Sequence, residues 1–171
     1  MKPRVVVIVG PTASGKTSAS IELAKRMNGE IISSDSMQIY QKMNIGTAKP
    51  TTEEMAGIKH YLIDFVSPTE NFNVTKYKEL AENAIEEILS HQKLPIIVGG
   101  TGLYVSTLIH GIEFSEVPED TLYREEMLEL AKEKGNEYLH EMLAQIDKEA
   151  AFHIEKNNVR RVIRALEIYQ V

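Results

Sequence analysis

The stretch Gly10-Pro11-Thr12-Ala13-Ser14-Gly15-Lys16-Thr17 decides the fold of this chain. It follows the apolar run Val5–Val9 and precedes a stretch with helical spacing, which is the order of a phosphate-binding P-loop. In that arrangement backbone N–H groups and a helix N-terminus surround a phosphate. The loop therefore predicts a diphosphate or triphosphate ligand, with Lys16 on the outer phosphates and Thr17 on Mg²⁺. It does not distinguish a nucleotide from a prenyl diphosphate.

Buried strands and helices alternate on both sides of this loop. The pattern predicts a fully buried central strand at 5–9, strands at 30–34 and 94–98, a shorter strand at 61–65, and helices at 17–27 and 74–91. Such alternation is typical of a parallel sheet covered on both faces. Only helical patterns follow, at 120–134, 136–144, 148–155 and 157–171. We therefore expect an α/β protein with a P-loop NTPase-like parallel sheet flanked by helices in residues 1–112 and a helical lobe or insertion in residues 113–171.

The bulk composition narrows the class of protein. The chain has 171 residues, no cysteine and a formal net charge of −6, so disulfides and thiolate metal sites are excluded. The apolar run before Gly10 is too short for a signal peptide or a membrane span. We expect a soluble, cytoplasmic monomer without a membrane partner. Because neither glycine nor proline ends the last helical pattern before Val171, we also expect a truncated sequence.

Polar residues follow two of the predicted strands. Asp35 comes directly after 30–34, and Gly99-Gly100-Thr101-Gly102 closes 94–98. The carboxyl ends of parallel strands share the edge that carries the P-loop. A carboxylate there is suited to act as a general base or to ligate Mg²⁺, and the Thr101 hydroxyl is suited to stabilise a developing negative charge. The structural alternatives are an N-cap or turn role for Asp35 and an ordinary strand-to-helix turn at 99–102.

A basic cluster lies in the last predicted helix. Arg160 and Arg164 share one face of that helix, and Arg161 is adjacent to it. Such a cluster suits contact with a phosphate backbone. The alternative is a solvated helix face whose arginines pair with Glu155 and Glu167.

Taken together, these segments resemble the tRNA dimethylallyltransferase family, also called tRNA isopentenyltransferases. The matching blocks are GPTASGKT (10–17), SSDSMQIY (33–40), GTAKP (46–50), VGGTGLY (98–104) and RRVIRALEIY (160–169). The resemblance implies transfer of a dimethylallyl group from its diphosphate to N6 of an adenine beside the tRNA anticodon. It implies that the P-loop holds the donor diphosphate, that Asp35 accepts a proton from the exocyclic amine, and that Thr101 lies beside the reacting centre.

The resemblance also implies a set of tRNA contacts. They are Asp35, Ser36, Met37 and Gln38 at the target adenine, together with Thr101, Arg124, Asn157, Asn158, Val159, Arg160 and Arg161. Family members are considerably longer, so we expect a truncated chain to have reduced activity or none. The alternatives are an adenylate isopentenyltransferase that uses free AMP, ADP or ATP, a P-loop small-molecule kinase, and a remnant that binds without turnover. The arginine helix and the helical lobe favour tRNA as the acceptor.

Overall fold

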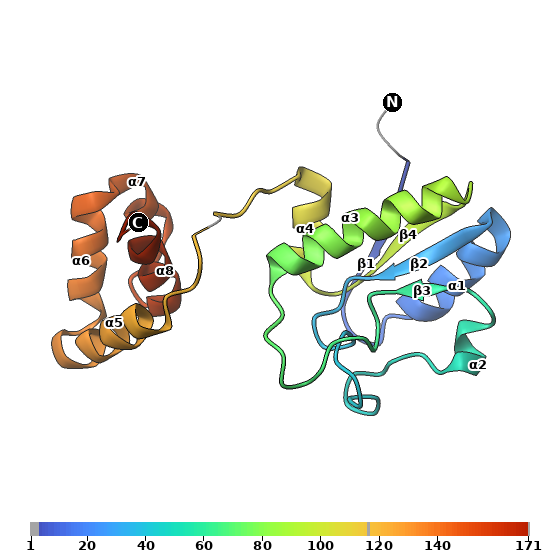
Figure 1. The fold of residues 1–171 in the computed structure, drawn as a ribbon, viewed down its shortest axis with the longest axis horizontal. Helices are drawn as coiled ribbons and strands as arrows, with labels where there is room; N and C mark the ends of the chain where they lie inside the picture. The colour runs from blue at the N-terminus through green and yellow to red at the C-terminus, as the bar shows by residue number, and fades with distance from the viewer. Residues whose placement is uncertain (1–3, 116, 171) are drawn as a thin grey trace. The chain divides into compact units, whose positions relative to one another are not determined.

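The computed structural model describes residues 4–115 and 117–170 and contains two compact units, Met1–Glu113 and Phe114–Val171. The first unit holds the sheet and its helices: β1 (Val6–Val9), α1 (Lys16–Met27), β2 (Gly29–Ser33), α2 (Thr52–Met55), β3 (His60–Tyr61), α3 (Val74–Ser90), β4 (Leu94–Gly99) and α4 (Gly102–His110). The second unit is helical: α5 (Thr121–Lys134), α6 (Asn136–Ile146), α7 (Lys148–His153) and α8 (Val159–Gln170) (Figure 1).

The sheet of the first unit has four parallel strands in the order β1-β4-β2-β3. Strand β4 lies between β1 and β2, so that Ile96 is opposite Val6 on one side and Ile31 on the other. Every crossover between neighbouring parallel strands passes through a longer connection, as parallel pairing requires. The predicted α/β class with a parallel sheet flanked by helices is confirmed.

Alternating side chains along the strands build a core on each face of the sheet. Ile31 and Ile96 pack with residues of α1, among them Ile21 and Ala24. The next residue of each strand faces the other way, and these residues pack with α3 and α4 in a cluster of Ile32, Ile97, Tyr77, Ala81, Ala84, Ile88 and Tyr104. The period-2 alternation of strand side chains therefore separates α1 from α3 (Figure 1).

Two strand predictions differ from the structure. We predicted the run Val5–Val9 to be a fully buried central strand, but β1 is at one end of the described sheet, and Val9 is 59% exposed. A continuous apolar run indicates burial of both faces and does not reveal how many strands pair with it. The third strand is shorter than predicted, because Leu62 and Asp64 have φ values of +58° and +57°, which interrupt an extended ladder.

The second unit packs its four helices around a core of its own, and the predicted helices all form. Its buried residues are Ala131, Leu139, Leu143, Ala151, Val162, Ile163 and Leu166. Asp120 begins α5 by accepting the Tyr123 N–H, and Asp147 begins α7 by accepting the Ala150 N–H. Among the described residues, no helix combines the length and apolar character that a membrane crossing requires.

Candidate active site

The P-loop connects β1 to α1. Gly15 has a φ of +82°, a left-handed conformation that suits glycine, and it begins the helix without a side-chain cap. The first N–H groups of α1 are therefore not occupied by a capping side chain. Lys16 lies over the loop and donates from Nζ to the Pro11 carbonyl at 2.6 Å. Backbone donors and an ammonium group thus meet at one end of the helix, which is the arrangement that binds phosphate.

Asp35 caps the turn that follows β2. Its Oδ1 accepts the N–H of Met37 at 2.9 Å and that of Gln38 at 3.3 Å. The structure therefore contains the turn role that we considered as the alternative. No hydrogen bond from a described residue reaches Oδ2, so one carboxylate oxygen holds the turn and the other is available to a ligand. The role as a base stays a prediction.

Thr101 connects the Asp35 turn to the end of β4. Its N–H donates to the Ser34 carbonyl at 3.1 Å, and its Oγ1 accepts the Ser36 N–H at 2.9 Å. The backbones approach so closely that a Cβ at Gly99 would overlap the Ser34 carbonyl. The hydroxyl predicted to stabilise negative charge thus holds the turn in the structure.

The P-loop lies at the same sheet edge. A Cβ on Gly100 would lie 3.6 Å from the Gly10 carbonyl oxygen, so the P-loop and the end of β4 are in close contact. Thr17, Ser33 and Gln38 line one cavity of about 30 Å³, so the start of α1 and the Asp35 turn share a boundary. The structure therefore brings together Lys16, Thr17, Asp35 and Thr101. This agrees with the prediction, because these residues follow the carboxyl ends of three neighbouring parallel strands.

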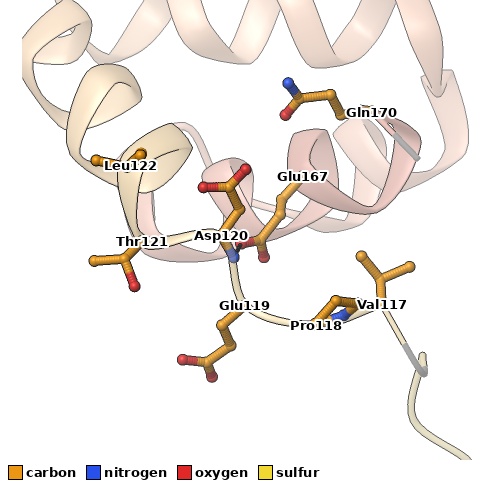
Figure 2. A pocket seen from close by; sticks show the side chains of 8 residues that line it. All are labelled: Val117, Pro118, Glu119, Asp120, Thr121, Leu122, Glu167 and Gln170. Carbon is orange, nitrogen blue, oxygen red and sulfur yellow. Dashed lines mark hydrogen bonds between the residues drawn. The ribbon is translucent and has the colours of Figure 1, made fainter.

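Arg124 belongs to an ion-pair cluster inside the helical unit. Its Nε and Nη2 donate to the two oxygens of Glu167 at 2.8 Å each, and Nη1 of Arg164 donates to the same carboxylate at 2.5 Å. The Asp120 N–H at the start of α5 adds a contact of 2.8 Å (Figure 2). Glu167 is only 2% exposed. Burial raises the pKa of Glu167, but these hydrogen bonds outweigh burial and lower the pKa to about 2.

The predicted tRNA contacts at the start of α8 are on the surface. Asn157, Asn158, Arg160 and Arg161 are exposed, and Val159 is the first residue of α8. The arginine cluster divides in two, since Arg164 pairs with Glu167 whereas no ion pair joins Arg160 or Arg161 to a residue of the described ranges. Arg124, Arg160 and Arg164 nevertheless line one cavity of about 480 Å³, together with Glu119, Leu128 and Ile163.

Lys49 is a residue to which the sequence led us to assign no role. Its side chain is 6% exposed, which is rare for lysine outside an ion pair. The available signal was a charged residue inside the otherwise uncharged block GTAKP at 46–50.

Comparison with known proteins gives consistent matches. A family model described as IPP transferase matches residues 38–171. The tRNA dimethylallyltransferase of Acetivibrio thermocellus is 62% identical over 165 residues, covering 96% of this chain and 53% of the relative. The tRNA dimethylallyltransferase of Bacillus cytotoxicus is 56% identical over 169 residues, covering 99% of this chain and 54% of the relative. The chain spans about half the length of the curated relatives it matches.

Solved structures resemble the chain in sequence and fold. The full-length tRNA isopentenylpyrophosphate transferase from Bacillus halodurans has a TM-score of 0.67 and 51% identity, and the match covers 99% of this chain and 56% of that one. A eukaryotic dimethylallyltransferase acting on tRNA has a TM-score of 0.83 and 36% identity, covering 98% and 42%. Both likenesses extend over nearly all of the present chain.

Proposed function

Because the chain belongs to the IPP transferase family, we propose that it carries the reaction centre of a tRNA dimethylallyltransferase. The observation that supports this most directly is the convergence of the P-loop, the Asp35 turn and Thr101 at one sheet edge. A phosphate cradle beside a carboxylate with one unoccupied oxygen suits a reaction in which diphosphate leaves and a proton is removed. The relatives named above are tRNA dimethylallyltransferases, and we propose that the reaction takes place in the cytoplasm.

The P-loop would bind the diphosphate of the donor. N–H groups at the start of α1 and the Lys16 ammonium stabilise the negative charge that grows on the leaving group. Thr17, exposed at the first turn, would supply the protein oxygen for Mg²⁺. Among described residues no group of three His, Cys, Asp or Glu could enclose a metal, which fits an ion that takes most ligands from phosphate and water. Bound Mg²⁺ would neutralise charge on the diphosphate.

Asp35 would act on the acceptor amine. The adenine N6 forms a bond to C1 of the dimethylallyl group while the bond from C1 to the diphosphate oxygen breaks. One N6 proton passes to Oδ2 of Asp35, because the lone pair of an aromatic amine is a weak nucleophile until that proton leaves. Oδ1 stays bonded to the Met37 and Gln38 N–H groups, and Thr101 holds the turn through Ser36. These contacts keep the carboxylate in a fixed orientation.

The helical unit would supply contacts to the tRNA backbone. Arg160 and Arg161 are exposed cations, and Asn157, Asn158 and Val159 precede or begin their helix. Arg124 would add to them from the cavity that it shares with Arg160. Most protein hydrogen bonds to nucleic acid go to phosphate and sugar, which these donors suit.

A transfer assay tests the proposal. The chain is incubated with Mg²⁺, labelled dimethylallyl diphosphate, and either tRNA or AMP. We expect label in tRNA, whereas label in AMP alone would contradict the proposal. Asp35→Ala should slow transfer by about 10²- to 10⁴-fold and leave diphosphate affinity unchanged. Glu79→Ala, on the exposed face of α3, is the matched control. If Asp35→Ala abolishes diphosphate binding instead, the role of Asp35 is to hold the metal.

A further inference from the structure

The block 46–50 belongs to a loop that is built around one buried cation. Nζ of Lys49 donates to Oδ1 of Asp64 at 2.5 Å, to Oδ1 of Asn44 at 3.1 Å and to the Tyr40 carbonyl. An ammonium has three N–H donors, so these oxygens satisfy it completely. Tyr40 and Asn44 lie on either side of a turn at 41–42. By bonding to both residues, Lys49 fixes the loop against the segment that follows Asp35.

This loop determines whether the nitrogen or the oxygen of the Gln38 side-chain amide is available to a ligand. Nε2 of Gln38 donates to the Thr47 carbonyl at 3.0 Å and to the Ala48 carbonyl at 3.3 Å. An amide has two N–H donors, and both are used here. The reversed amide would place its oxygen against two carbonyl oxygens, which repel it. The carbonyls of residues 47 and 48 therefore bind the NH₂ group of Gln38. The side-chain oxygen Oε1 is left available to accept a hydrogen bond from a ligand.

An acceptor at that position has a use in the proposed reaction. The adenine N6 amine has two N–H groups, of which one is lost to Asp35 and the other stays on the product. The backbone N–H of Gln38 already bonds to Oδ1 of Asp35, so both side chains come from one turn. An acceptor next to the base would receive the second N–H.

We propose that Lys49 is a positioning residue for acceptor recognition: through the carbonyls of Thr47 and Ala48 it holds Gln38 so that Oε1 accepts the N6–H of the target adenine. This inference rests on the proposed function. It adds specificity, because a base with a carbonyl at the same ring position would place oxygen against oxygen. A site built to pair with a donor rejects the analogue that lacks it.

A binding experiment tests this without requiring turnover. Two anticodon stem-loops are compared, one with adenine at the target position and one with purine, which lacks the amino group. We expect the chain to bind the adenine form about four- to hundredfold more tightly, because the two N6–H groups donate to Asp35 and Gln38 and each hydrogen bond contributes about two- to tenfold. Lys49→Met should lower that ratio by about two- to tenfold, because the contact with Asp35 remains. Lys42→Met removes an exposed lysine of the same loop and should keep the ratio while losing a similar charge.

Three results overturn the inference. They are a wild-type chain with no preference for adenine, a folded Lys49→Met variant with the wild-type ratio, and a folded Gln38→Met variant with the wild-type ratio. Far-ultraviolet circular dichroism shows whether Lys49→Met is folded. If it is not, the adenine-to-purine ratio of Gln38→Met tests the inference instead. Failure of the proposed function is seen separately, as absence of label transfer by a chain whose adenine preference is intact.

Discussion

Replacing Glu167 with glutamine should destabilise the helical unit. Glu167 is 2% exposed and receives hydrogen bonds from Arg124, Arg164 and the Asp120 N–H. In Glu167→Gln the amide keeps one acceptor oxygen, and its NH₂ group faces a guanidinium. Removing one partner of a buried ion pair leaves the other charges uncompensated, which costs about 3–5 kcal/mol. The side chains of Arg124 and Arg164 are 30% and 31% exposed and keep some hydration, so we expect the lower end of that range.

The lowered pKa of Glu167 expresses the same contacts as a free energy. Its fall from 4.5 to about 2 corresponds to roughly 3 kcal/mol of folding free energy at neutral pH, at about 1.4 kcal/mol per pH unit. Because the folded-state pKa is the lower one, this stability is present above pH 4.5 and is lost as the pH falls toward 2. A unit of this size has a total stability of about 3–9 kcal/mol. One substitution therefore removes a third or more of it.

Thermal unfolding followed by circular dichroism at 222 nm, from pH 7 down to pH 2, checks the reasoning. We expect Glu167→Gln to lower the melting temperature of one transition at pH 7 and to weaken the loss of stability below pH 4.5. The control is Glu129→Gln, whose carboxylate pairs with Lys132 at the surface and is 72% exposed; it should change stability by less than about 0.5 kcal/mol. A Glu167→Gln variant that melts and titrates like the wild type would refute the argument.

Two further substitutions test the candidate site and the rest of the fold separately. Gly99→Ala should displace the Asp35 turn, because the new Cβ would overlap the Ser34 carbonyl. We expect the free energy of unfolding in urea to fall by at least about 3 kcal/mol and label transfer to fall with it. A fully active variant would contradict the packing argument. Glu30→Gln removes a buried carboxylate that bonds Lys93 at 2.6 Å and the Tyr61 hydroxyl at 2.9 Å. It should lower the free energy of unfolding by about 1–3 kcal/mol and leave diphosphate affinity unchanged in calorimetry, because Glu30 lies at the other end of β2.

The sequence contained enough to predict the sheet and most of its helices. The P-loop identified the first strand and helix, and the helical spacing in 74–91 predicted α3 to within one residue. Asp35 and Thr101 could be placed at the edge that carries the P-loop, because the carboxyl ends of parallel strands share one edge of the sheet. Each of these features is encoded within a short window of residues, which is why periodicity and spacing were sufficient.

What escaped prediction depends on contacts between distant residues. Arg124 and Glu167 are 43 positions apart, so no local pattern indicated that the arginine predicted to bind tRNA also compensates a buried carboxylate. The buried Lys49 pairs with Asp64, which lies 15 positions away, beyond α2 and β3. Strand order has the same origin, since the apolar character of β1 says nothing about its number of neighbours.

The position of β1 has a consequence for the behaviour of the chain in solution. Its outer side carries backbone N–H and C=O groups that no other described strand pairs with, and Val6–Val9 contains no charged side chain. Natural sheets protect such edges with lysine, proline or a bulge, because an unprotected edge recruits strands from other molecules. We therefore expect concentrated solutions of the chain to self-associate through intermolecular strand addition, and we expect Val9→Lys to suppress this association.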